Sequence, residues 1–184
     1  MADNISYRDL IYEFVPQETY WGDWCHSPQA YFRGARDIPG AKFNVGFQIF
    51  KGPVLLEREP HFHREEEYLF FLGAVFPDVF DFDAEIEFFM GDSPDQLEKF
   101  VITKPTAIRL PPLTWHCPLR FKRVSKPVLF QAALLHGDFG AVKRREGPDG
   151  FYYVYEGESV RSCVLEKNKR CVFCGRCFKD FGEG

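Results

Sequence analysis

The fold of this chain is indicated most directly by residues 61–67, HFHREEE, and by residues 111–116, PPLTWH. Side chains alternate between the two faces of a β-strand, so His61, His63 and Glu67 share one face if the first stretch is extended. Two imidazoles and a carboxylate on one face can bind a divalent metal, and His116 from another strand would complete a set of four ligands. Three of the five histidines of the chain lie in these two stretches. The two stretches therefore predict a metal site built on β-strands.

Two further carboxylates lie beside Glu67 in the first stretch. Glu65 has the same strand parity as Glu67 and is its rival as a ligand, whereas Glu66 has the opposite parity and is expected to point outward. Three imidazoles and one carboxylate suit Fe(II), Mn(II), Ni(II), Cu(II) or Zn(II), and the ligand types do not choose among these ions. The alternative is that no metal is bound. In that case His61 and His63 would face solvent, and His116 would be a hydrogen-bonded core residue.

These residues resemble the two sequence motifs of the cupin superfamily. In the first motif, His-x-His is followed by a glutamate after three or four residues and then, after about six more, by a glycine; Glu67 stands at the glutamate position here, and Gly73 comes slightly early. In the second motif a proline precedes a histidine by five residues, as Pro111 precedes His116. The resemblance covers roughly residues 43–135, about half of the chain. It favours Glu67 over Glu65 as the carboxylate ligand.

The chain departs from the cupin pattern at two places in the second motif. Leu113 stands where the family has a glycine, and Arg120 stands where it has an asparagine. Arg120 follows His116 by four residues, so on a regular strand the two side chains would share a face. We therefore expect Arg120 to bind the substrate, because a guanidinium pointing into a barrel can hold a carboxylate with two parallel hydrogen bonds. The alternative is that Arg120 reaches solvent at a strand end.

The rest of the chain is rich in short, strand-like stretches separated by glycine and proline. Phenylalanine contributes 21 residues and the hydrophobic fraction is 45%, which favours β structure with a packed core. The expected strands are 43–50, 54–59, 61–72, 84–90, 100–103, 107–110, 117–122, 128–135 and 151–155. This spacing predicts an all-β sandwich or barrel rather than parallel βαβ units. The cupin resemblance adds the architecture, a jelly roll or double-stranded β-helix.

Three regions follow from this pattern. Residues 1–40 are expected to be an irregular N-terminal extension, residues 41–137 a cupin-like β-barrel, and residues 138–184 a C-terminal strand and a cysteine-rich tail that packs on the barrel or on a partner chain. The barrel's edge strands need cover, and the tryptophan- and tyrosine-rich extension can supply it. We therefore expect a homodimer.

The tail contains three cysteines with C-x2-C-x2-C spacing and a fourth eight positions upstream. This spacing is typical of a tetrahedral zinc site or an iron–sulfur cluster, formed here by Cys163, Cys171, Cys174 and Cys177. The bacterial ferredoxin pattern would place a further cysteine and a proline after the run, and the chain lacks them, which places zinc ahead of a cluster. The alternative is a set of reduced, exposed thiols, or a disulfide formed on handling.

Composition narrows the function further. The net charge of -4 argues against a nucleic-acid surface, and no apolar run is long enough to span a membrane. The first residues lack the features of a signal peptide, so we expect a cytoplasmic protein with a small-molecule ligand. The prediction is a metal-dependent enzyme, an oxygenase or an isomerase or lyase, that acts on a small carboxylated or oxygen-rich molecule. The alternative is a non-catalytic, metal-centred module that binds a small molecule or senses redox state.

Overall fold

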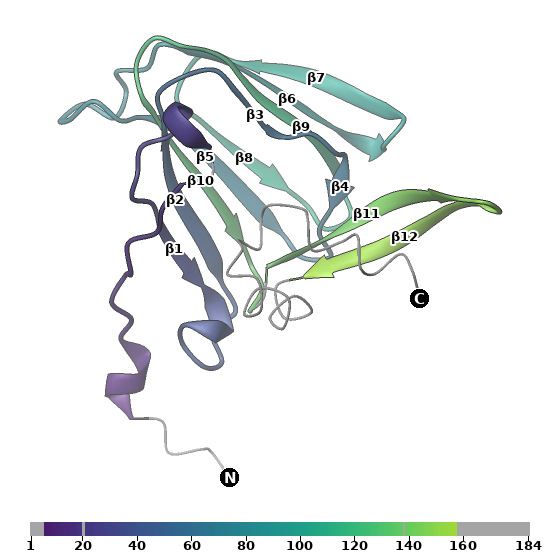
Figure 1. The fold of residues 1–184 in the computed structure, drawn as a ribbon, viewed down its shortest axis with the longest axis horizontal. Helices are drawn as coiled ribbons and strands as arrows, with labels where there is room; N and C mark the ends of the chain where they lie inside the picture. Colours follow the sequence, from purple (N-terminus) through teal and green to yellow (C-terminus); the bar gives the residue numbers. More distant parts are fainter. Residues whose placement is uncertain (1–5, 20, 138, 158–184) are drawn as a thin grey trace.

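The computed structural model describes residues 6–19, 21–137 and 139–157, which form two antiparallel β-sheets (Figure 1). One sheet has five strands in the order β1 (Ala30–Arg33), β2 (Asn44–Phe50), β10 (Val128–Leu134), β5 (Glu67–Gly73) and β8 (Thr106–Leu110). The other has seven strands: β12 (Gly150–Gly157), β11 (Gly140–Gly147), β4 (His61–Phe62), β9 (Trp115–Val124), β6 (Ala84–Ser93), β7 (Gln96–Ile102), and β3 (Val54–Glu57), which pairs with β9. The expected all-β class is therefore confirmed.

The helical part of the described chain is small. It consists of three short 3-10 segments, η1 (Tyr7–Leu10), η2 (Gly22–Trp24) and η3 (Gly34–Arg36). Within the described residues, no helix has the length and apolar character needed to cross a bilayer.

The strands differ from the sequence prediction in three places. β1 comes from residues 1–40, which were expected to be irregular, and β11 was not predicted at all. The stretch expected as one strand, residues 61–72, is divided into β4 and β5, which belong to different sheets. The chain crosses between the sheets at residues 63–66. Backbone hydrogen bonds hold this crossing, from Leu113 N to His63 O at 2.8 Å and from Leu135 N to Glu66 O at 2.9 Å.

A cluster of phenylalanines fills one end of the space between the sheets. Phe50, Phe71 and Phe121 are 0% exposed and Phe130 is 3% exposed. The rings of Phe50 and Phe121 lie 4.4 Å apart between centroids, and those of Phe71 and Phe130 lie 5.1 Å apart. These tilted aromatic contacts add to the stabilisation that comes from the apolar area buried by the cluster. This end of the molecule is therefore a solid hydrophobic core.

The inward side chains become smaller and then polar toward the other end of the same sheet. The row after the phenylalanines contains Gly46 and Ala132, which pair across β2 and β10. The next row contains Asn44, Leu134 and Glu67, which pair across β2, β10 and β5. Directly paired residues of antiparallel strands point to the same face, so this row also faces the second sheet. The sandwich is therefore solid at one end and has a polar interior at the other.

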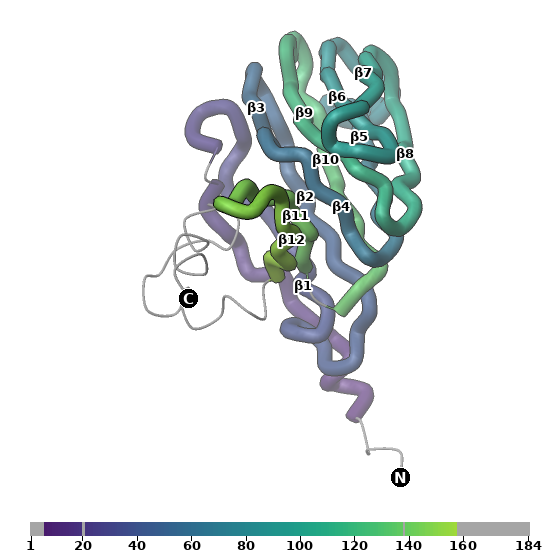
Figure 2. Tube along the Cα trace, turned by 90° about the vertical axis from the view of Figure 1, so that its right-hand side faces the viewer, coloured from purple at the N-terminus to yellow at the C-terminus, as the bar shows by residue number. Residues whose placement is uncertain are grey.

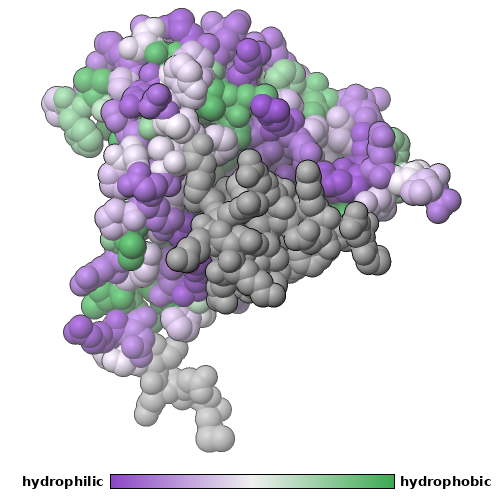
Figure 3. Space-filling view, viewed as in Figure 1, coloured by the Kyte–Doolittle hydropathy of each residue, from purple (hydrophilic) through white to green (hydrophobic). Residues whose placement is uncertain are grey.

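The polar end is enclosed by segments from outside the central strands. In Figures 1 and 2, β1, β4 and the β11–β12 hairpin lie at the lower end of the two sheets. The N-terminal segment runs along β1 and β2, with Phe14 5.8 Å from Phe47 and Tyr12 5.9 Å from Phe32 between ring centroids. On the face seen in Figure 3, hydrophilic side chains alternate with apolar patches.

Candidate metal centre

The three predicted histidines meet inside the polar end of the sandwich. His61 lies on β4 and pairs directly with His116 on β9, and His63 lies just after β4. His61 is 7% exposed, His116 is 2% exposed and His63 is 3% exposed. One nitrogen from each imidazole lies within 4.8 Å of the others, in an arrangement that can hold a metal ion. The ladder between β4 and β9 therefore places ligands that are far apart in sequence side by side.

Each imidazole is oriented by a backbone carbonyl. The Nδ1 atoms lie 3.0 Å from the carbonyl oxygen of Glu59 for His61, 2.6 Å from that of Gly140 for His63, and 2.9 Å from that of Thr114 for His116. A carbonyl oxygen only accepts hydrogen bonds, so each Nδ1 carries the proton and each Nε2 presents a lone pair in the neutral ring. This is the arrangement by which proteins orient metal-binding histidines.

Glu67 brings a carboxylate from the opposite sheet to two of these imidazoles, those of His63 and His116. It is the first residue of β5 and is 4% exposed. Its Oε2 atom lies 3.4 Å from Nε2 of His63 and 3.3 Å from Nε2 of His116. Two donors that are each about 2.1 Å from one ion, at angles between tetrahedral and octahedral, would be roughly 3.0 to 3.4 Å apart. The observed separations therefore fit a shared metal ion.

The buried atoms of this site also require a cation. Among the described residues, His63 Nε2 and Glu67 Oε2 are buried and have no hydrogen-bond partner. Lone pairs of imidazoles that face a carboxylate repel one another unless a positive charge lies between them. Either a proton on an imidazole or a metal ion has to supply this charge, so the residues present fit a bound metal.

The pKa values of the site show the same balance of charge. Burial lowers the pKa of His61 well below its ordinary value, and His116 and His63 lower it further. Burial alone would lower the pKa of His63, but the adjacent Glu67 carboxylate outweighs burial and raises it. Burial alone would raise the pKa of Glu67, but His63 and His116 outweigh burial and hold it far below its usual range. The carboxylate is therefore ionised, and its charge favours a cation beside Nε2 of His63, which is the place that a metal would take.

The neighbouring carboxylates lie outside the histidine cluster. Glu66 forms an ion pair with Arg109 and accepts a hydrogen bond from the Tyr68 hydroxyl at 2.8 Å. Glu65 lies 3.6 Å from the exposed imidazole of His136. Glu67 is thus the carboxylate that the structure brings to the histidines. The crossing between sheets places it there, not the continuous strand on which the parity of residues 61–67 relied.

The expectation that Arg120 shares a face with His116 is wrong. Arg120 is exposed and pairs with Leu55 and Glu87 on the neighbouring strands. Phe88 pairs with Leu119 whereas Met90 pairs with His116, so β9 contains a bulge between these positions. The bulge reverses the alternation, and Cys117, Leu119 and Phe121 follow His116 into the interior. Pro118 is the sequence signal of this bulge, because proline inside a strand is confined to edges and bulges.

The six cysteines of the chain fall into two groups. Cys25 and Cys117 are buried thiols, and burial raises the pKa of each. The predicted tail site, Cys163, Cys171, Cys174 and Cys177, lies outside the described residues.

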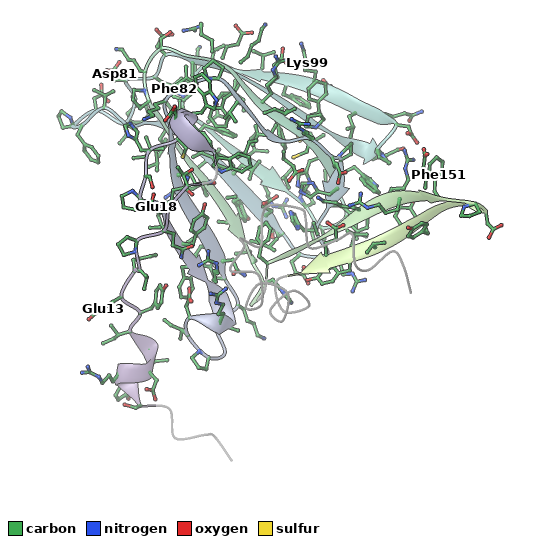
Figure 4. The ribbon with its side chains drawn as sticks, in the orientation of Figure 1. Glu13, Glu18, Asp81, Phe82, Lys99 and Phe151 are labelled. Carbon is green, nitrogen blue, oxygen red and sulfur yellow. The ribbon has the colours of Figure 1, made fainter. Side chains whose placement is uncertain are left out.

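A cavity of about 180 Å³ opens beside the histidines. Besides metal-site residues, its wall contains small and apolar side chains and a set of polar ones that the sequence prediction missed: Arg33, Asn44, Gln48, Glu57, Lys143 and Glu156. Lys143 and Glu156 belong to the β11–β12 hairpin, which closes this end, and their Nζ and Oε2 atoms are 3.4 Å apart. The available signal was the β2 sequence, in which Asn44 and Gln48 alternate with apolar residues. Figure 4 shows side chains of both sheets pointing into the space between them, while Phe151 lies out on the hairpin.

No family model and no curated protein matches this sequence. Among solved structures, the chain is similar to peruvianin-I, a cysteine peptidase from Thevetia peruviana latex, with 14% sequence identity, a TM-score of 0.51, and coverage of 77% of this chain and 80% of that chain. Two weaker similarities are to a mutant of Bacillus subtilis oxalate decarboxylase, with 12% identity, a TM-score of 0.47 and coverage of 70% and 29%, and to hydroxypropylphosphonic acid epoxidase from S. wedmorenis, with 10% identity, a TM-score of 0.41 and coverage of 67% and 55%. The likeness to peruvianin-I concerns the fold alone.

Proposed function

We propose that this chain is a cupin-type, metal-dependent enzyme that acts on a small carboxylated or oxygen-rich molecule, as an oxygenase or as an isomerase or lyase. A single transition-metal ion would be held by His61, His63, Glu67 and His116. One observation carries the proposal. Three buried imidazole nitrogens lie within 4.8 Å of one another at the wall of a cavity, a buried carboxylate oxygen lies 3.3 and 3.4 Å from two of them, and each imidazole is already oriented by a backbone carbonyl.

The metal would supply Lewis acidity, or a redox centre if it is iron, manganese or copper. The protein side chains have two other tasks. The cavity walls would hold the ligand beside the metal, and the ionisable groups of these walls can exchange protons with the ligand. Glu57 is the candidate for proton transfer, because it lines the cavity and its Oε1 atom accepts hydrogen bonds from the amides of Arg58 at 3.0 Å and Glu59 at 3.3 Å.

A non-catalytic binding module is the second candidate, and one observation favours it. The other ionisable pair of the cavity wall, Lys143 and Glu156, is engaged in a network of ion pairs. Lys143 Nζ lies 3.3 Å from Glu59 Oε2, and Arg145 donates to Glu156 Oε1 at 2.7 Å. Groups held in this way organise the cavity wall more readily than they transfer protons.

Elemental analysis of purified protein tests the metal, with His116→Ala as the site variant and His26→Ala as the control. His26 is exposed and lies outside the cluster. We expect the wild-type protein and the control to carry about one more divalent ion per chain than His116→Ala. This difference remains interpretable even if the tail binds a metal of its own. Equal metal content in all three proteins, including after reloading with each candidate ion, would defeat the proposal.

A substrate screen then separates the two candidate functions. Metal-loaded protein is incubated with small carboxylic and hydroxylated acids, with and without oxygen, and both turnover and binding are measured. Turnover that His116→Ala abolishes supports the enzyme. Binding without turnover of any bound acid supports the module.

A further inference from the structure

A row of inward-facing residues connects the metal centre to an arginine at the far side of the cavity. Arg33 on β1 pairs with Asn44 on β2, Asn44 pairs with Leu134 on β10, and Leu134 pairs with Glu67 on β5. Residues paired in this way point to the same face of the sheet. Arg33, Asn44 and Glu67 all line the cavity. The cavity therefore has a metal-binding carboxylate at one end of the row and a guanidinium at the other.

The length of this row sets the length of a ligand that spans it. Three strand spacings of about 4.8 Å place the backbones of Arg33 and Glu67 roughly 14 Å apart. The side chains of both residues extend into the cavity wall and shorten the span that remains between their charged groups. The cavity volume of about 180 Å³ leaves room for an acid of three or four carbons.

Asn44 lies in the middle of the row and has one atom without a partner. The residue is 4% exposed, and its Nδ2 donates to the carbonyl oxygen of His136 at 2.5 Å. This bond fixes the orientation of the amide, because the opposite orientation would place oxygen against oxygen. Oδ1 is then buried, and among the described residues it has no hydrogen-bond partner. A buried acceptor without a partner is costly, so a ligand that donates an O–H or N–H to it is favoured.

Arg33 supplies the complementary group beside Asn44. It is 8% exposed, its guanidinium donates to Gln17 Oε1, and it lies 4.9 Å from the centre of the Tyr31 ring. These contacts hold a planar fork of donors that matches a carboxylate. A second buried donor in the same wall, Trp21 Nε1, also lacks a partner among the described residues. This part of the cavity is therefore suited to carboxylate oxygens.

We propose that the cavity binds a short dicarboxylate that carries a hydroxyl group. One carboxylate lies at Arg33, the hydroxyl donates to Oδ1 of Asn44, and the second carboxylate lies at the metal centre, so the inference rests on the proposed function. An ammonium group could also donate to Asn44. It is disfavoured because Arg33 is the direct cross-strand neighbour of Asn44 and like charges repel.

Binding of three four-carbon acids to cobalt(II)-loaded, full-length protein tests this inference. Malate carries the hydroxyl, succinate lacks it, and aspartate carries an ammonium group in its place. Affinity is measured by calorimetry, and contact with the metal is followed by the visible absorption of cobalt. We expect malate to bind about tenfold more tightly than succinate, because only malate satisfies Asn44. Aspartate should bind more weakly than malate.

Variants identify the residues that cause the preference. Asn44→Leu should remove the preference for malate while leaving the affinity for succinate nearly unchanged. Arg33→Gln should weaken the binding of both acids by about ten- to a hundredfold, and Arg33→Lys by less, because lysine keeps the charge but not the fork. Arg120→Gln is the control and should leave binding unchanged, because Arg120 is exposed on the outer face.

Circular dichroism and cobalt content establish that each variant is folded and loaded. No binding of any acid to loaded wild-type protein, equal affinities for malate and succinate, or a preference for aspartate would overturn the inference. So would an Arg33→Lys variant that is folded and loaded but binds malate with wild-type affinity. None of these results would contradict the proposed metal site, because each is obtained with protein that has bound cobalt. A wild-type protein that does not bind cobalt would instead remove the proposed function itself.

Discussion

Replacement of Glu67 by glutamine should remove most of the stabilisation that a metal gives to this protein. Glutamine keeps the size of the side chain but loses the charge that lies 3.3 and 3.4 Å from two imidazole nitrogens. Removal of a residue that hydrogen-bonds to a metal ligand weakens metal binding by about 10- to 100-fold. Loss of the charge of a ligand itself should therefore weaken metal binding by about 100-fold or more. Glu66→Gln is the matched control, because Glu66 pairs with Arg109 outside the cluster.

The effect on stability follows from mass action. At a free metal concentration about 100 times the wild-type Kd, the metal stabilises the folded state by about 2.7 kcal/mol. At the same concentration a variant with about 100-fold weaker binding gains only about 0.4 kcal/mol. For a chain of this size about 1 kcal/mol corresponds to roughly 2–4 °C in Tm. The wild-type protein and Glu66→Gln should therefore gain about 5–11 °C on adding metal, and Glu67→Gln about 1–2 °C.

Scanning calorimetry of chelator-treated protein, with and without buffered free metal, measures these shifts. The comparison is made within each variant, so a change in the stability of the metal-free protein does not affect it. A full shift in Glu67→Gln would show that the carboxylate is not a ligand. Equal losses in both variants would show that the chain crosses between the sheets in a different register.

Four further predictions concern other parts of the molecule. Metal affinity should fall as the pH is lowered from about 8 to about 6, because the pKa of His63 is raised and a proton that is bound below this pKa must leave before the metal binds; chelator competition at each pH measures it, and a flat profile would contradict it. Phe121→Ala should lower the free energy of unfolding by about 3–5 kcal/mol, since the ring is 0% exposed and packs among other phenylalanines; urea unfolding measures it, and a loss under about 1 kcal/mol would show that the core can close the space. Light scattering at micromolar concentration should report a dimer, and a monomer would rule out the expected homodimer. Chelator should make the C-terminal tail sensitive to protease while the barrel survives, if zinc is bound there by Cys163, Cys171, Cys174 and Cys177; brown, air-sensitive protein would indicate a cluster instead, and resistance to chelator in colourless protein would end the tail-site prediction.

The ligand types could be predicted from local sequence, but the path that joins them could not. Residue type and spacing predict His61, His63, Glu67 and His116. The structure brings the three imidazoles together and places the Glu67 carboxylate 3.4 Å from the imidazole of His63 and 3.3 Å from that of His116. Strand parity places these residues on one face only if residues 61–67 form one strand, whereas β4 ends at Phe62 and β5 begins at Glu67. The crossing depends on hydrogen bonds to Leu113 and Leu135, which are distant in sequence.

The polar wall of the cavity could not be predicted for the same reason, because it also depends on contacts between residues that are distant in sequence. Alternation in β2 shows that Asn44 and Gln48 share one face and that Phe47 lies on the other. If only the apolar face of β2 were buried, Asn44 and Gln48 on its other face would point to solvent. Both faces are covered instead, since Phe47 packs against Phe14 of the N-terminal segment and the polar face lines the cavity.

Amino-acid order thus sufficed for the strand content, for most of the strand positions and for the four metal-ligand candidates, because alternation and ligand chemistry are local properties. Tertiary structure alone decided which face of each strand lies inside, because that depends on what covers the opposite face. It moved Arg120 to the surface through a bulge in β9, and it brought Arg33 from the N-terminal region to the cavity by pairing β1 with β2. Pairing and bulges arise from contacts between segments far apart in the chain, and a period of two along one strand carries no information about them.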